Sequence, residues 1–129
     1  MSKIIDDYYG AVGNYDDLLL KAVSKDPTEV RSVLETTEKV MKDYARRITY
    51  TQIRNVLQEV KKDNFDTDLG SFYRAIPKLA YMEGRLPKND NGRPLLSFIR
   101  ELAGTVKQGQ YKSFKELMNT IVAYHKLHG

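Results

Sequence analysis

Apolar residues recur along most of the chain at intervals of three and four, which is the spacing of one face of an α-helix. No run alternates apolar and polar residues over the length of a strand, and no repeat period is evident. A length of 129 residues fits one domain. The pattern therefore predicts an all-α fold, with residues 1–129 forming a single compact bundle of five to six helices.

Residues that can cap free backbone amides mark the first helix starts. Asn14 begins a helix with two aspartates in its first turn, and the mostly apolar body of this helix, which stops near Ser24, indicates burial. Two glycines interrupt residues 1–13, which are expected to form an arm or a short turn. Asp26, followed by a proline, starts a second helix that reaches about Arg47.

Later starts follow the same logic. Thr49 and Gln52 have the spacing of a capping box, in which each side chain bonds the backbone amide of the other. Leu86–Pro94 is rich in proline, asparagine and glycine, so it is expected to be a loop whose last proline opens the next helix. Ser113 and Glu116 form a second capping box, which predicts the start of the last helix.

The stretch Ser71–Arg85 combines an apolar stripe with a polar row that can bind a ligand. Four residues of the row, spaced i, i+4, i+7 and i+11, lie within about 60° of one another on an ideal helix: Arg74, Lys78, Tyr81 and Arg85. Three cations and a phenol can bind phosphates and stack on a base, or form a solvated basic face. Pro77 predicts that a first helix stops at Ala75 and a second restarts around it, and Gly84 is expected to end that helix in a left-handed cap.

Charge is distributed unevenly along the chain. The net formal charge is +4, but residues 1–40 hold five Lys/Arg against eight Asp/Glu, whereas residues 41–129 hold sixteen against nine. A polyanion is therefore expected to meet the later segments, and the opening segment could face a basic partner. The chain contains no cysteine, no apolar run of membrane-spanning length and no signal-peptide core. These features predict a cytoplasmic protein without a membrane partner.

The sequence offers little support for catalysis or for metal binding. His125 and His128 lack the further ligands that a metal site needs, and His125 is expected to be partly buried in the last helix. The glycine-containing loops do not match a calcium-binding loop or a phosphate-binding loop, and no nucleophile–histidine–acid grouping has supporting context. We therefore expect no catalytic residue, no cofactor and no metal.

Three short segments carry a family resemblance. They are Thr49–Arg54 with its Gln-Ile-Arg core, Pro77–Tyr81 followed by Gly84-Arg85, and Ile121–Lys126. In this order and spacing they resemble the small subunit of type III-A CRISPR (Csm) effector complexes, over residues 49–129. The family tends to place Glu-Ala before the last segment, where this chain has Asn119-Thr120.

The resemblance implies a non-catalytic helical subunit. Its partners would be the backbone of guide RNA and target RNA, the other subunits of the effector complex, and copies of itself in a head-to-tail, filament-like stack. Base pairing would then supply sequence specificity, while the protein contacts the RNA backbone. Arg54, Lys78 and Arg85 match the family motifs and are the leading RNA contacts. Face geometry adds four further cations, which are Arg46, Arg47, Lys61 and Arg74.

Two other functions remain open. A helical scaffold could use its surfaces only for protein contacts, with the acidic first helix docking on a basic patch of the next copy. A helical DNA-binding regulator would need a helix-turn-helix, and none is obvious in the sequence. Within the matched motifs, structural readings are favoured for Gln52 as a cap and for Tyr124 and His125 as packing residues.

Overall fold

A computed structural model describes residues 3–129, which form helices and connecting loops without a strand. The helices are α1 (Lys3–Tyr8), α2 (Tyr15–Ala22), α3 (Pro27–Tyr44), η1 (Ala45–Arg47), α4 (Tyr50–Val60), η2 (Asp63–Asp66), α5 (Leu69–Gly84), α6 (Arg93–Gly104) and α7 (Tyr111–His128), where η denotes a 3-10 helix. The all-α prediction is confirmed. The predicted number is too low, because these residues form seven α-helices where five to six were expected.

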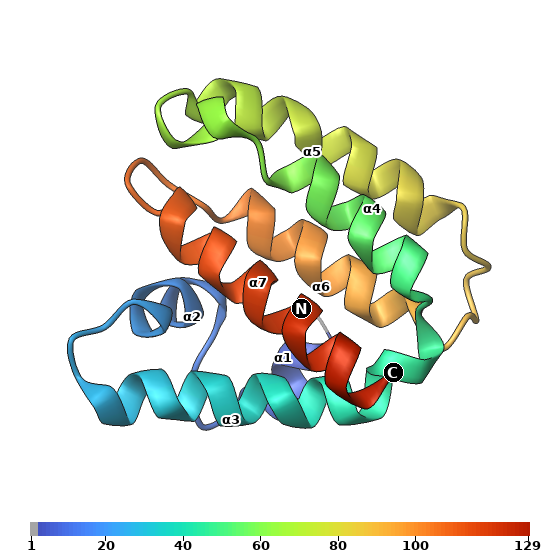
Figure 1. Ribbon diagram of the computed structural model, residues 1–129, viewed down its shortest axis with the longest axis horizontal. Helices are drawn as coiled ribbons and strands as arrows, with labels where there is room; N and C mark the ends of the chain where they lie inside the picture. Colours follow the sequence, from blue (N-terminus) through green and yellow to red (C-terminus); the bar gives the residue numbers. More distant parts are fainter. Residues whose placement is uncertain (1–2) are drawn as a thin grey trace.

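α7 occupies the middle of the bundle and packs against α2, α3 and α4 (Figure 1). It can do so because its apolar face is broad, with Phe114, Met118 and Ile121 almost fully buried. Aromatic rings join this face to α5: the ring of Phe72 lies 5.1 Å from that of Tyr111 and 5.2 Å from that of Phe114, edge to face in both pairs. Helices that are far apart in sequence thus share one core.

The predicted caps of α2, α3 and α4 are confirmed. Asn14 and Thr49 each form a reciprocal capping box, the latter with Gln52, and the side chain of Asp26 accepts from a first-turn amide of α3. The expected burial of α2 is wrong in part, because its C-terminal half ends at the surface: the side chain of Leu20 is 62% exposed.

The described part of the chain begins with a helix, α1. The sequence predicts an arm or a short turn over residues 1–13, of which residues 1–2 lie outside the described part. Within the described part, α1 buries Ile4, and Tyr9 stacks on Phe98 with 5.5 Å between ring centroids. The hydroxyl of Tyr9 lies 2.8 Å from Thr37 Oγ1, and burial raises the pKa of Tyr9 to about 12. Apolar residues therefore anchor this segment despite its glycines.

α5 runs through Pro77 without stopping, so the predicted break after Ala75 is wrong. Pro77 lies on the exposed side of the helix, while Phe72 and Leu79 on the opposite side are buried. Burial on both sides of the proline holds the helix together although one backbone hydrogen bond is lost. The predicted left-handed cap at Gly84 is also wrong, because among the described glycines only Gly13 and Gly109 have positive φ.

The loop before α6 is confirmed, and Pro94 lies in the first turn of that helix as predicted. The start of α7 differs from the prediction. The helix begins at Tyr111, so Ser113 lies inside its first turn and does not cap it. Ser113 is buried and donates a hydrogen bond to the backbone carbonyl of Leu19 in α2. A tertiary contact thus takes the hydroxyl that a capping box would use locally.

Candidate nucleic-acid interface

α4 and α5 lie side by side and antiparallel, so the start of α4 and the end of α5 meet at one end of the molecule (Figure 1). The short helix η1 connects α3 to α4 at the same end. These three elements and the residues directly after them carry all seven cations that the sequence proposes as RNA contacts, with Lys61 directly after α4 and Arg85 directly after α5. Each of the seven is exposed.

The row predicted on α5 lies on the exposed side of that helix. Arg74 Nη2 donates to Ser71 Oγ at 2.9 Å, and the guanidinium of Arg85 lies 5.9 Å from the centroid of the Tyr81 ring. Lys78 Nζ lies 3.3 Å from a carboxylate oxygen of Glu59 on α4, but the Lys78 side chain remains 58% exposed. One carboxylate therefore partly neutralises the middle of an otherwise cationic row.

Arg54 lies on a different side of α4 from the residues that face α5. The residues on the side that faces α5 are spaced i, i+3 and i+7, namely Gln52, Asn55 and Glu59. About the helix axis, Arg54 is rotated by about 140° from Glu59. Lys61 shares the side of Arg54, where its Nζ lies 3.4 Å from Asn119 Oδ1 of α7. The cations thus form two rows, one on α5 and one on the far edge of α4, and not one continuous strip.

The cations of η1 differ in how firmly they are held. The guanidinium of Arg47 lies 4.5 Å above the Tyr44 ring, and its Nη1 donates to Asn91 O at 3.4 Å. Arg46 has neither an ion pair nor a hydrogen bond from its side chain within residues 3–129, and the same holds for Arg54. Among the seven cations, Arg46 and Arg54 are therefore the two whose side chains make no hydrogen bond, ion pair or ring contact with the described residues.

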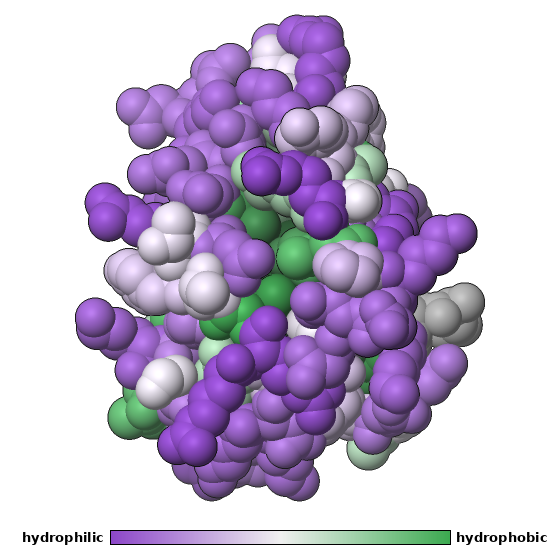
Figure 2. All heavy atoms as spheres, turned by 90° about the vertical axis from the view of Figure 1, so that its right-hand side faces the viewer, coloured by the Kyte–Doolittle hydropathy of each residue, from purple (hydrophilic) through white to green (hydrophobic). Residues whose placement is uncertain are grey.

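A cleft of about 420 Å³ lies between the start of α4, the end of α5 and the side of α6. Its lining combines apolar side chains with amides, a phenol and a guanidinium, contributed by Gln52, Asn55, Val56, Tyr81, Met82, Arg85, Leu86 and Leu96. Figure 2 shows this end of the molecule, where apolar atoms are visible in a hollow framed by hydrophilic residues. Sequence analysis missed the cleft, although the polar spacing of Gln52 and Asn55 outside the apolar stripe of α4 was a usable signal.

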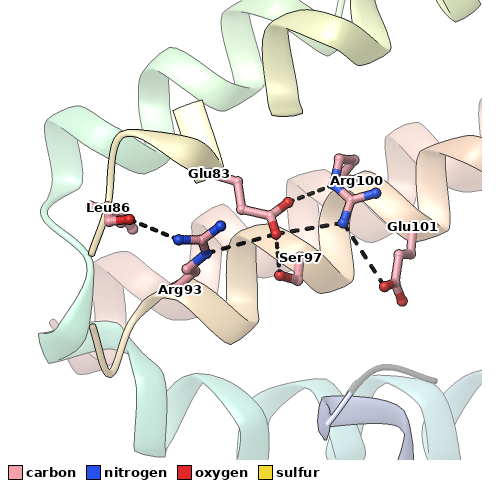
Figure 3. A network of polar contacts seen from close by, with 6 residues as sticks. All are labelled: Glu83, Leu86, Arg93, Ser97, Arg100 and Glu101. Carbon is pink, nitrogen blue, oxygen red and sulfur yellow. Dashed lines mark hydrogen bonds and ion pairs between the residues drawn. The ribbon is translucent and has the colours of Figure 1, made fainter. Parts of the chain in front are cut away.

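A buried carboxylate holds the end of α5 against α6 (Figure 3). Glu83 accepts hydrogen bonds from Ser97 Oγ at 2.6 Å and from Arg100 Nε at 2.5 Å, and Arg93 Nε lies 3.9 Å from it. Burial by itself would raise the pKa of Glu83, but hydrogen bonds from Arg100 and Ser97, with the charges of Arg100 and Arg93, bring that pKa below its usual value. The hydrogen bond to Glu83 also raises the pKa of Arg100.

This network turns two cations of α6 away from solvent. Arg93 and Arg100 turn toward Glu83, and Arg93 Nη1 also donates to the Leu86 carbonyl at 2.9 Å. Sequence reasoning missed Glu83 because it occupies an otherwise apolar face of α5. Tyr81 and Arg85, which line the cleft, lie two residues before and two residues after Glu83. By holding Glu83, α6 therefore also positions this part of the cleft.

The two histidines are held by internal contacts. His125 is buried with Nε2 2.7 Å from Ile48 O, and His128 Nε2 lies 2.9 Å from Glu38 Oε2. No group of three or more potential metal ligands occurs within residues 3–129. In the same part of the chain, no helix is both long enough and apolar enough to cross a membrane.

Fold and surface together define an all-helical protein with two exposed rows of cations on adjacent helices. The family model described as Csm2 Type III-A matches residues 27–129, which extend from the start of α3 to the end of the chain. The chain therefore belongs to the Csm2 family, the structural small subunits of type III-A CRISPR effector complexes. The resemblance drawn from the three motifs is thereby confirmed. No curated protein and no solved structure matches the chain.

Proposed function

We propose that this subunit lines the groove that holds guide RNA paired with target RNA, and that it stacks on copies of itself. Its contacts are to the RNA backbone, because exposed Lys and Arg side chains neutralise phosphates without reading bases. The observation that carries the proposal is the placement of Arg74, Lys78 and Arg85 in one exposed row on α5, next to the second row on α4. We further propose that it acts in the cytoplasm as a non-catalytic component.

The two-row geometry refines which cations act together. Lys78 and Arg85 can follow one strand of an RNA duplex along α5, whereas Arg54 and Lys61 can meet the backbone on the other edge of α4. Arg46 and Arg47 extend the surface at the end where α4 begins. Lys78 is expected to contribute less than Arg85, because Glu59 already offsets part of its charge.

A surface made for protein contacts is the second candidate, and a separate observation favours it. Leu20 of α2 and Val23, directly after the helix, are exposed and border a cleft of about 490 Å³ shared with the start of α7. The same helix carries Asp16 and Asp17 in its first turn. An apolar patch beside negative charge can dock on a neighbouring subunit or copy, and this function is compatible with RNA binding elsewhere on the chain.

The test compares two triple variants in a complex assembled with the other subunits. Changing Arg54, Lys78 and Arg85 together to alanine is expected to weaken crosslinking to RNA. In titrations of the full chain, it should also reduce the slope of log affinity against log salt by about 2. The melting temperature should change little, because exposed substitutions usually alter the free energy of unfolding by less than about 0.5 kcal/mol each.

The matched control removes the same formal charge from α3, where Arg31, Lys39 and Lys42 are exposed. This variant should retain both the RNA crosslink and the salt slope. Equal behaviour of the two triple variants would contradict the proposed site. A complex that assembles fully but shows no crosslink between this chain and RNA would instead favour the scaffold.

A further inference from the structure

We propose that the cleft between α4, α5 and α6 binds one unpaired nucleobase of the RNA whose backbone follows the cationic rows. This inference rests on the proposed function, since it adds a base to a site otherwise assigned to phosphates. Its starting point is the position of the cleft, which shares Tyr81 and Arg85 with the row on α5.

The lining of the cleft matches the chemistry of a base. A nucleobase has two flat apolar faces and a polar edge, and it is commonly bound between aromatic or aliphatic side chains with amides at the edge. The aliphatic walls come from Val56, Met82 and Leu96. Tyr81, which is 68% exposed, supplies an aromatic ring. The volume of about 420 Å³ lies in the range of small-molecule sites.

Two amides are available for the edge of the base. Gln52 uses Oε1 to accept from the Thr49 amide at 2.8 Å, which orients the side chain and leaves its Nε2 group open as a donor. Asn55 makes no side-chain hydrogen bond within residues 3–129, so it can both donate and accept. Adjustable donors and acceptors of this kind would tolerate different bases, as a subunit that binds guides of any sequence requires.

The charge around the cleft favours a nucleotide over an apolar segment of protein. Arg85 lines the cleft, and Lys78 lies two turns earlier on the same exposed side of α5. A base inside the cleft would thus have its own phosphates beside cations. A base held in a duplex offers only its edge, so the occupant must be unstacked from its neighbours.

The experiment uses the full chain at low salt and two RNA duplexes that differ by one unpaired 2-aminopurine nucleotide. The chain should bind the bulged duplex more tightly than the fully paired one, and binding should change the fluorescence of the bulged base. Tyr81→Ala should weaken binding of the bulged duplex by about 5- to 160-fold, the range for losing one base–aromatic stack, with little effect on the paired duplex. Tyr81→Phe keeps the ring and should retain the preference.

The outcomes separate the two proposals. Equal affinity for both duplexes, or an equal effect of Tyr81→Ala on both, would overturn the inference and leave backbone binding intact. Failure of the proposed function has a different signature: the Arg54, Lys78 and Arg85 triple variant would then bind the paired duplex as tightly as the unaltered chain does. Tyr81 is largely exposed, so Tyr81→Ala should melt close to the unaltered chain, and a melting scan checks this.

Discussion

Removing the carboxylate of Glu83 is expected to destabilise the protein more than any other single loss of a charged group on α4 or α5. Glu83 is 8% exposed, accepts hydrogen bonds from Ser97 and Arg100, and forms a longer ion pair with Arg93, all three on α6. Glu83→Ala leaves two guanidinium groups facing an apolar helix surface. It also removes the polar contacts that hold the end of α5 on α6 (Figure 3).

The magnitude follows from burial on both sides of the network. Breaking a fully buried ion pair by removing one partner costs about 3–5 kcal/mol. Here the side chains of Arg93 and Arg100 are 25% and 32% exposed, so both can regain water after the substitution. We therefore expect Glu83→Ala to lower the free energy of unfolding by about 2 kcal/mol. For a chain of this size, this corresponds to a fall in melting temperature of about 8 °C.

Thermal and urea unfolding, followed by circular dichroism, measure this loss. Glu59→Ala is the matched control, because Glu59 also faces cations from two positions but is 28% exposed in its side chain. That control should cost less than about 1 kcal/mol, as exposed ion pairs do. A Glu83→Ala variant no less stable than Glu59→Ala would show that burial does not strengthen the Glu83 network.

The acid dependence gives a second check with a definite sign. The pKa of Glu83 is lowered in the folded protein, so the network contributes its full stability above the ordinary glutamate value of 4.5. That contribution is lost as the pH falls below 4.5 through the folded value. The difference in stability between the unaltered chain and Glu83→Gln should therefore be constant near neutrality and shrink in acid. A difference that grows as the pH falls would contradict the assigned direction.

Three further substitutions test contacts at single positions. Gly92→Ala should lower the free energy of unfolding by about 2 kcal/mol, because a Cβ there would lie 2.4 Å from the Arg47 carbonyl oxygen. At Gly104 an added Cβ would meet nothing within 4 Å, so Gly104→Ala should leave the free energy of unfolding unchanged or raise it by up to about 1 kcal/mol. Urea unfolding midpoints distinguish this result from the loss expected at Gly92. Tyr9→Phe should cost about 1 kcal/mol by losing the buried bond to Thr37. A Tyr9→Phe variant as stable as the unaltered chain in the same assay would show that this hydrogen bond makes no net contribution.

Local patterns in the sequence predict where most helices begin and which faces they bury. Asn14, Asp26 and Thr49 cap their helices as predicted, because a cap involves backbone amides only two or three residues away. Likewise, the apolar spacing of α6 predicts its buried residues, since helical periodicity alone decides which side chains share a face.

Features that depend on distant residues are set by the packing of the helices. Pro77 stays inside a helix because the core holds both halves of α5. The Ser113 hydroxyl donates to a backbone carbonyl of α2 instead of capping α7. The separation of Arg54 from the row on α5, and the cleft beside Tyr81, depend on how α4 is rotated against its neighbours. A single chain reveals which residues share a face of one helix, but only packing determines which faces of different helices meet.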